Sequence, residues 1–242
     1  MIGSSVESAL EAVRTIRALG VGANIMLIGT AAQDRGALTG QTEPLGSALP
    51  VQMLAVEPSS GPAGMRNRAL LHAAHDHVVL MDADTELVSR NVDHFYRSIR
   101  ETGAAAVYGT VICFGDHRDD IRVKNNESFR DRAFGDDYLD GFAMYDRQQI
   151  LDSGGFSEQE ALSEASDWEL FLRLAANGRR IVFVPLVFGT RSTRPGSPAE
   201  EAAARKAAAS AHIHARFGPL SERAQKAIKT RHLRYHPDIG YL

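Results

Sequence analysis

HVVLMDADTEL, residues His77 to Leu87, is the stretch of sequence that decides the predicted fold. Its apolar run, Val78 to Met81, stops at two carboxylates, Asp82 and Asp84. Four apolar residues in succession are typical of a strand buried on both faces, as in the middle of a parallel sheet. The carboxylates then lie at the C-terminal end of that strand, where open α/β sheets bind ligands, and can hold a hard divalent cation beside a phosphate-bearing substrate. The alternative is a turn in which one of the acids caps a helix beginning near Val88.

The composition favours one soluble α/β domain with appendages. The 242 residues have ordinary apolar and charged content, and a formal net charge of -3 gives no reason to expect nucleic acid or an anionic membrane as a partner. The single cysteine, Cys113, excludes an internal disulfide and argues against a disulfide-stapled secreted domain. No stretch approaches the roughly 20 apolar residues of a membrane span, and residues 1–19 lack the layout of a signal peptide. We therefore expect a cytoplasmic protein without a membrane span.

Strand and helix patterns alternate along the chain, as in βαβ units of a parallel sheet. Within residues 138–152 they predict a short strand followed by a helix from about residue 146, and a further strand over residues 181–184 that Pro185 stops. The long polar stretch at residues 115–137 is interpreted as a lid or acceptor-facing loop. The other predicted helices cover residues 6–19, 63–74, 88–102, 167–177, 197–217 and 221–230, and the other predicted strands cover residues 25–28, 51–56, 78–81 and 105–114.

Four stretches in a fixed order carry a resemblance to a known family. They are Gly61 to Leu70, Val78 to Leu87, Gly154 to Phe156 followed by Ser166 to Leu174, and Arg191 to Ser197. Together they resemble the family 2 glycosyltransferases of the GT-A fold over roughly residues 23–197. The resemblance implies a mixed, mostly parallel central sheet flanked by helices, with a glycosyltransferase-like domain at residues 1–197 and a C-terminal helical extension and tail at residues 198–242.

The same resemblance implies transfer of a sugar from a nucleotide diphosphate donor to an acceptor hydroxyl. The acceptor, which can be a glycan, a lipid, a natural product or a protein, and the oligomeric state stay open. By position, Asp82 and Asp84 are the Asp-x-Asp motif, in which Asp84 binds Mn²⁺ or Mg²⁺ and Asp82 reaches the donor. A cation held there neutralises charge on the departing diphosphate. Arg66 corresponds to a basic residue that approaches the donor, and its alternative is a solvated helix arginine.

Asp167 matches the position of the catalytic base in the resembled family, although Ser166 stands where a glutamate is more common. Its alternative is a helix cap, because a carboxylate at the start of a helix accepts from unpaired N–H groups. A single base opposite the leaving group implies inversion of configuration. Asp140 and Gly141 are placed on the acceptor side by position, as is Trp168, which has the alternative of a core anchor.

The chain departs from the family pattern at three further places. The usual first apolar strand is absent, and Gly29 to Ala31 offers no acid to read the nucleotide base. Arg194 stands where a histidine near the metal is common, and with Arg191 it can bind diphosphate and replace or supplement the metal. The alternative is that both arginines are solvated loop charges. These departures support a second hypothesis, a glycosyltransferase-like binding protein without turnover. A nucleotidyltransferase is a third, less favoured because the chain lacks a glycine-rich, lysine-containing loop at its start.

Overall fold

The structure is a computed structural model. It describes residues 13–14, 16, 24–29, 51–55, 57, 60–82, 84–115, 121–125, 127, 129, 133, 137–192, 199–218, 235–236 and 240–241. The helix expected at residues 6–19 is described only at residues 13, 14 and 16, which are helical. The helix expected at residues 221–230 and the division expected at residue 197 lie outside the described residues.

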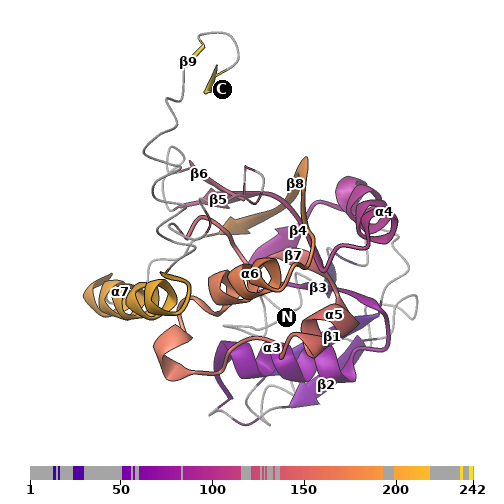
Figure 1. Cartoon of the computed structure of the whole chain (residues 1–242). Helices are drawn as coiled ribbons and strands as arrows, with labels where there is room; N and C mark the ends of the chain where they lie inside the picture. Colours follow the sequence, from indigo (N-terminus) through magenta and orange to yellow (C-terminus); the bar gives the residue numbers. More distant parts are fainter. Residues whose placement is uncertain are drawn as a thin grey trace.

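A six-stranded mixed sheet forms the centre of the described part (Figure 1). Its strands run in the order β3-β7-β5-β8-β4, and β6 pairs with β5. The expected mixed sheet is confirmed, but only β5 and β8 pair in parallel within it, so antiparallel pairings predominate. The strands are β3 (His77–Leu80), β4 (Thr85–Leu87), β5 (Ala106–Phe114), β6 (Ile121–Lys124), β7 (Ala143–Asp146) and β8 (Ile181–Ser192).

Strand β3, which carries the apolar run before Asp82, does not lie in the middle of a parallel sheet. It is half-buried, lies at the end of the strand order and pairs antiparallel with β7. Strands β1 (Ile25–Gly29) and β2 (Val51–Ala55) form a separate parallel pair. A cavity of about 830 Å³ lies between β1 and β3, lined by residues of both strands. The prediction of a central strand was wrong because no strand among the described residues pairs with the second edge of β3.

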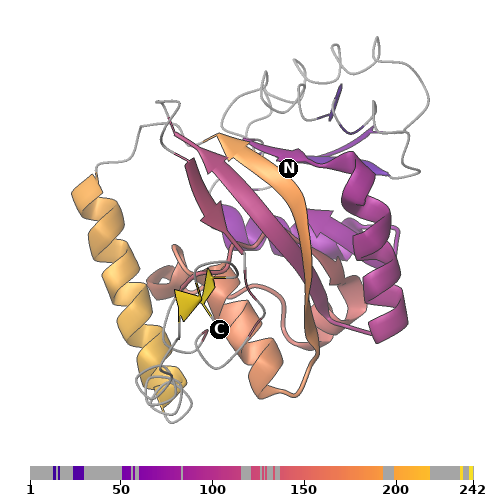
Figure 2. The same ribbon diagram turned by 90° about the horizontal axis from the view of Figure 1, so that it is seen from above.

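Two helical layers cover the sheet, as Figure 2 shows for the long strands β5 and β8. Alternate residues of β5 point to opposite faces. Val107 packs in one buried cluster with Phe95 of α4, whereas Tyr108 packs in another with Phe171 of α6 and Ile213 of α7. The helices are α3 (Gly61–His72), α4 (Val92–Thr102), α5 (Arg147–Asp152), α6 (Ser166–Ala176) and α7 (Ala199–Arg216), with short 3₁₀ turns η3 (Ser89–Asn91) and η5 (Glu160–Leu162) and a terminal hairpin of β9 (Tyr235–His236) and β10 (Gly240–Tyr241).

Several sequence predictions need correction at element boundaries. The helix expected from Val88 begins at Val92, with Asn91 at its N-cap, and β4 precedes it. Asp82 and Asp84 therefore do not cap this helix. Strand β8 continues past Pro185 because the register with β5 shifts there, and proline is tolerated where a bulge leaves its backbone out of the ladder. The loop expected at residues 115–137 contains strand β6.

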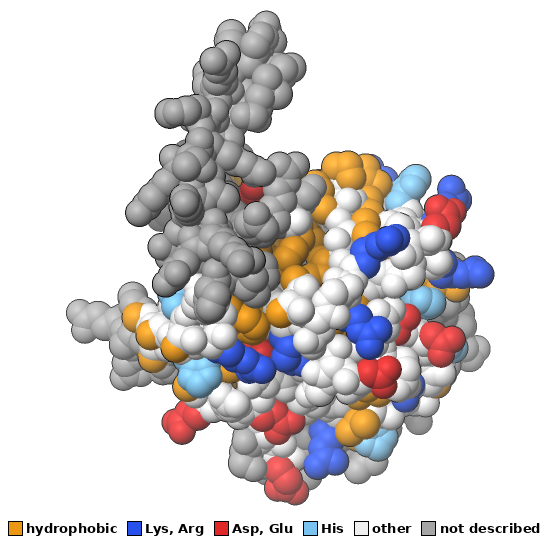
Figure 3. All heavy atoms as spheres, viewed as in Figure 1, with side chains coloured by type: hydrophobic (Ala, Val, Ile, Leu, Met, Phe, Trp, Pro, Cys, Tyr) orange, Lys and Arg blue, Asp and Glu red, His pale blue; other side chains and the backbone are white. Residues whose placement is uncertain are grey.

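The surface in view mixes both charge signs. Figure 3 shows side chains of Lys and Arg interspersed with those of Asp and Glu over the described part of this face. Cys113 is a free, buried residue, as expected from its apolar run. Among the described residues, none of the helices combines the length and apolar character needed to cross a membrane.

Candidate active site

Charged side chains from five separate segments meet at one end of the sheet. The carboxylates follow β3, precede β7 and begin α6, while the guanidinium groups come from α3 and β8. All six of these residues were predicted as site residues from the sequence, and the fold brings them into one cluster. The cluster consists of Arg66, Asp82, Asp84, Asp140, Asp167 and Arg191.

Asp167 is held from two sides at the first turn of α6. Arg66 Nη1 donates to Asp167 Oδ1 at 2.5 Å, and the backbone N–H of Gly141 donates to Asp167 Oδ2 at 3.2 Å. The Gly141 carbonyl in turn accepts from the Tyr145 hydroxyl at 2.7 Å. The N-cap position of α6 is Ala165, and no side chain caps the helix. Asp167 is therefore a cluster residue and not a helix cap.

Gly141 has a steric reason to be glycine. A Cβ atom placed on it would lie 2.8 Å from Asp167 Oδ1 and closer still to Cγ and Oδ2. Real Cβ atoms do not approach other heavy atoms this closely, so any side chain here would displace the carboxylate. The absence of a side chain thus allows the backbone N–H to reach Asp167.

Arg191 is the second basic centre of the cluster. Its guanidinium donates to Asp140 twice, from Nη1 at 2.6 Å and from Nη2 at 3.2 Å. The contacts to the other two carboxylates are longer, 3.3 Å to Asp82 Oδ2 and 3.6 Å to Asp84 Oδ1. Nε also donates to the Thr85 hydroxyl at 3.1 Å. This arginine is therefore engaged by three carboxylates and is not a solvated loop charge.

Asn125 fixes Asp140 and was not predicted as a site residue. Its side chain is fully buried, with Oδ1 accepting from the Asp140 backbone N–H at 2.6 Å and Nδ2 donating to the Asp140 carbonyl at 3.2 Å. The backbone of Asn125 has φ of 54°, in the left-handed region that asparagine tolerates better than most residues. That tolerance is the only signal that the sequence offers for it.

The glycine turn before α6 supports Arg66. Asn67, its neighbour in α3, accepts from the Phe156 backbone N–H at 2.7 Å and donates to the Phe156 carbonyl at 2.9 Å. Gly155 has φ of 70°, and a Cβ there would meet Asn67 Oδ1 at 2.5 Å. The Arg66 guanidinium lies 5.5 Å from the centre of the Phe156 ring. The motif Gly154 to Phe156 therefore orients α3 and its arginine.

Burial and neighbouring charges shift the pKa values in this cluster. Burial raises the pKa of Asp167, and the Arg66 guanidinium opposes that shift without cancelling it. Burial would lower the pKa of Arg66 and Arg191, but their carboxylate neighbours outweigh it and raise both. Burial also raises the pKa of Tyr145, which stays a donor to Gly141. Asp167 therefore keeps its proton to a higher pH in the folded chain than in the unfolded chain. Its contribution to folding stability falls as the pH rises from its ordinary pKa to its raised pKa.

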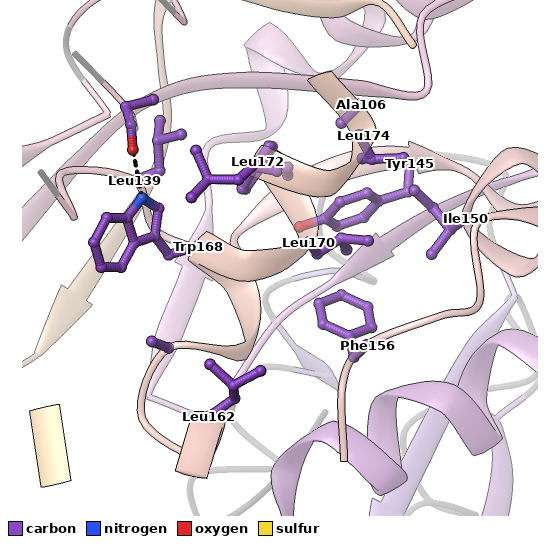
Figure 4. Close-up of a cluster of buried hydrophobic side chains, with 14 of the residues drawn as sticks. Ala106, Leu139, Tyr145, Ile150, Phe156, Leu162, Trp168, Leu170, Leu172 and Leu174 are labelled. Carbon is purple, nitrogen blue, oxygen red and sulfur yellow. Dashed lines mark hydrogen bonds between the residues drawn. The ribbon is translucent and has the colours of Figure 1, made fainter. Parts of the chain in front are cut away.

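The two residues after Asp167 face the protein core. Trp168 belongs to the buried cluster drawn in Figure 4, where its indole N–H donates to the Ala133 carbonyl at 2.6 Å. Glu169 is completely buried. Its carboxylate is neutralised by Arg173 at 2.9 Å and by Arg216 of α7 at 2.9 Å. The burial of this charge is tolerated because two arginines compensate it.

Asp82 and Asp84 are the most accessible carboxylates of the cluster that could hold a divalent cation. Asp82 and Asp84 keep side-chain exposures of 30% and 35%, while Asp140 has 5%. Within the described part of the chain, no group of three or more His, Cys, Asp or Glu residues is arranged to hold a metal ion. Magnesium needs only one or two carboxylates when substrate phosphates and water complete its shell, so the accessible pair fits such a role. Arg194 lies outside the described residues.

Comparisons with known proteins agree with this architecture. Residues 47–154 match the family model described as glycosyl transferase family 2. The structure of S. aureus TarS 1-349 in complex with UDP is similar with a TM-score of 0.60 and 16% identity, covering 81% of this chain and 60% of that one. Mannosyltransferase PcManGT from Pyrobaculum calidifontis, in complex with GDP-Man and Mn2+, has a TM-score of 0.57 and 16% identity, covering 94% of this chain and 72% of that one. The chain has the GT-A fold.

The resemblance to family 2 glycosyltransferases is confirmed over residues 47–154, and the similar structures show the GT-A fold. The structure of TarS 1-349 in complex with UDP-GlcNAc is also similar, with a TM-score of 0.62 and 14% identity, and covers 81% of this chain and 58% of that one. The chain spans about three fifths of the length of the TarS 1-349 structures. No curated protein matches the sequence. The family match includes Arg66 and the Asp-x-Asp motif but ends before Asp167 and Arg191. Those two residues are connected to the matched region by their contacts with Arg66, Asp82 and Asp84.

Proposed function

We propose that the chain is a glycosyltransferase that moves a sugar from a nucleotide diphosphate donor to an acceptor hydroxyl, with Asp167 as the base. The observation that carries this proposal is the pair of contacts that fix the Asp167 carboxylate, from Arg66 and from Gly141, beside the acids of the Asp-x-Asp motif. The side chain of Asp167 keeps 25% exposure, so an acceptor can reach it. Gly141 and Asp140 then lie on the acceptor side of this base.

The geometry supports direct displacement with inversion. Asp167 takes the proton of the acceptor hydroxyl as its oxygen bonds to the anomeric carbon. The bond from that carbon to the phosphate oxygen breaks, and its electron pair leaves with the nucleoside diphosphate. The raised pKa of Asp167 makes the carboxylate a stronger base than an ordinary exposed aspartate, which favours proton abstraction.

A divalent cation suits the charge balance of the site. Four carboxylates outnumber the two guanidinium groups of the cluster, and a diphosphate adds further negative charge. In this proposal Asp84 and Asp82 hold Mg²⁺ or Mn²⁺, which would stabilise the leaving diphosphate when bound. The Mn2+ named for the PcManGT complex supports this assignment. Arg66, Arg191 and Arg194 are proposed to bind the donor.

Donor binding gives the first test. The names of the similar structures contain UDP, UDP-GlcNAc and GDP-Man, so calorimetry should compare UDP, GDP and TDP sugars with and without Mn²⁺. At least one should bind, and Asp167→Asn should abolish transfer while leaving its affinity nearly unchanged. If a folded chain binds none of these sugars, the enzyme proposal is wrong. If Asp167→Asn loses donor binding, the role given to Asp167 is wrong.

A binding protein without turnover is the second candidate. The arrangement of β1 and β3 supports this candidate. These two strands belong to separate sheets and line one cavity, so they are not paired with each other where the nucleotide base is expected to bind. The two candidates differ in one measurement. A chain that binds a nucleotide sugar but neither transfers nor hydrolyses it, across a panel of glycan, lipid and protein acceptors, would favour the binding protein.

A further inference from the structure

The Arg191 guanidinium lies among the carboxylates of Asp82, Asp84 and Asp140. We propose that Arg191, positioned by Asn125 and Asp140, competes with the divalent cation for Asp82 and Asp84 and couples cation binding to diphosphate binding. This inference deepens the proposed function and rests on its divalent cation. It assigns a role to Asn125 and Asp140 that is separate from contact with the acceptor.

The unequal contacts of Arg191 carry the first step. The guanidinium binds Asp140 closely through two nitrogens, at 2.6 and 3.2 Å, but contacts Asp82 and Asp84 at 3.3 and 3.6 Å. Asp140 is nearly buried, whereas Asp82 and Asp84 are about one third exposed. A cation arriving from solvent therefore meets the loosely held pair first, and it can replace Arg191 there without breaking the pairing with Asp140.

Asp140, which binds Arg191, is itself held in place by contacts that do not involve Arg191. Asn125 clamps both backbone polar groups of Asp140, and the Phe142 N–H donates to Asp140 Oδ1 at 3.0 Å. Lys124 Nζ approaches Asp140 Oδ2 at 3.7 Å and adds positive charge. When a cation takes Asp82 and Asp84, Arg191 thus remains fixed beside them. A planar guanidinium in that place suits the oxygens of a diphosphate.

Energetic coupling follows from this arrangement. Without a diphosphate, a cation must displace the favourable contacts of Arg191 with Asp82 and Asp84, and it is also repelled by the guanidinium charge. With a diphosphate present, Arg191 gains a new anionic partner, so the displacement costs less. Cation and nucleoside diphosphate should therefore each raise the affinity of the other, by the same factor.

Manganese binding tests the proposal without any activity measurement. Calorimetry should measure the Kd of Mn²⁺ for the full chain, alone and with saturating UDP or GDP. Arg191→Gln should bind Mn²⁺ at least tenfold more tightly in the absence of nucleotide and should lose most of the coupling. Arg191→Lys keeps the charge but loses the two-nitrogen pairing with Asp140, so its Mn²⁺ affinity should fall between those of the wild type and Arg191→Gln. Arg97→Gln, which removes an exposed charge on α4, controls for net charge and should change little. Equal or weaker Mn²⁺ binding by Arg191→Gln would overturn the proposal.

The positioning role of Asp140 needs a double-mutant cycle. Asp140→Asn should weaken Mn²⁺ binding, because Arg191 then turns fully to Asp82 and Asp84, and this effect should shrink in the Arg191→Gln background. Equal effects in both backgrounds would mean that Asp140 does not act through Arg191. Absence of Mn²⁺ binding in every variant, with and without nucleotide, would overturn this inference alone, since metal-free binding of a nucleotide sugar would still support the proposed function.

Discussion

Replacing Gly141 with alanine offers a sensitive test of the proposed base. The substitution adds one methyl group and keeps the backbone conformation accessible. The new Cβ would lie 2.8 Å from Asp167 Oδ1 and closer to Cγ and Oδ2. Carbon atoms in contact prefer separations of about 3.5 to 4.0 Å, so the carboxylate must move by about 1 Å.

The size of the effect follows from that displacement. Asp167 is held by Arg66 at 2.5 Å and by the Gly141 N–H at 3.2 Å, and both contacts must lengthen or break. A misplacement of about 1 Å in a reacting group costs about a hundredfold in rate. That factor corresponds to about 2.7 kcal/mol of transition-state stabilisation. Because the Asp-x-Asp acids are untouched, donor affinity should change by less than about threefold, or about 0.7 kcal/mol.

The assay is steady-state transfer with the donor that calorimetry identifies. Gly141→Ala should lower kcat about a hundredfold while circular dichroism and donor Kd stay close to those of the wild type. Gly64→Ala is the matched control, because its Cβ would meet only Ser60 at 3.1 Å and the end of Glu158 at 3.4 Å. A kcat for Gly141→Ala within about threefold of the wild type would refute the reasoning that Asp167 must keep this position.

Three further predictions address the cation, the pH dependence and the core. Asp84→Ala should weaken Mn²⁺-dependent donor binding by at least about tenfold in calorimetry, about 1.4 kcal/mol, and an unchanged Kd would contradict its metal role. The kcat/KM of transfer should rise as the pH rises through the raised pKa of Asp167. Arg66→Gln should shift this rise to higher pH, because it removes the positive charge that lowers the pKa of Asp167. A shift to lower pH would contradict the pairing of Arg66 with Asp167. Glu169→Gln should reduce the free energy of unfolding by about 3 kcal/mol in urea denaturation, since it removes the carboxylate that compensates the mostly buried Arg173. Glu160→Gln, at an exposed position, should change it by less than about 0.5 kcal/mol.

The parts of the site that sequence reasoning identified depend on local patterns. An apolar strand followed by Asp82 and Asp84 is visible within a few neighbouring residues, whereas Asp167 at the start of its helix was placed in the site by the family resemblance. The glycine turn before Phe156 is equally local. The family resemblance placed the rest of the charged cluster, although it did not show that Arg66 and Asp167, which are 101 residues apart in the chain, are in contact.

The remaining features depend on tertiary contacts that no short window contains. Asn125 looks like an ordinary polar loop residue, and only the backbone of Asp140 beside it reveals its role. Pro185 reads as the end of a strand, but the bulge against β5 lets β8 continue for seven more residues. Glu169 reads as a surface acid because the arginine that neutralises it from α7 lies far along the chain.

The ion pair between the buried Glu169 and Arg216 of α7 bears on where this protein can be shortened. The helix that presents Asp167 at its first turn also presents Glu169 two residues later, and that carboxylate relies on the last turn of α7. A truncated chain that ends before Arg216 would remove one of the two arginines that neutralise the buried Glu169. Expression boundaries and fusion points at the C-terminal side should therefore lie beyond Phe217, which packs in the same buried cluster.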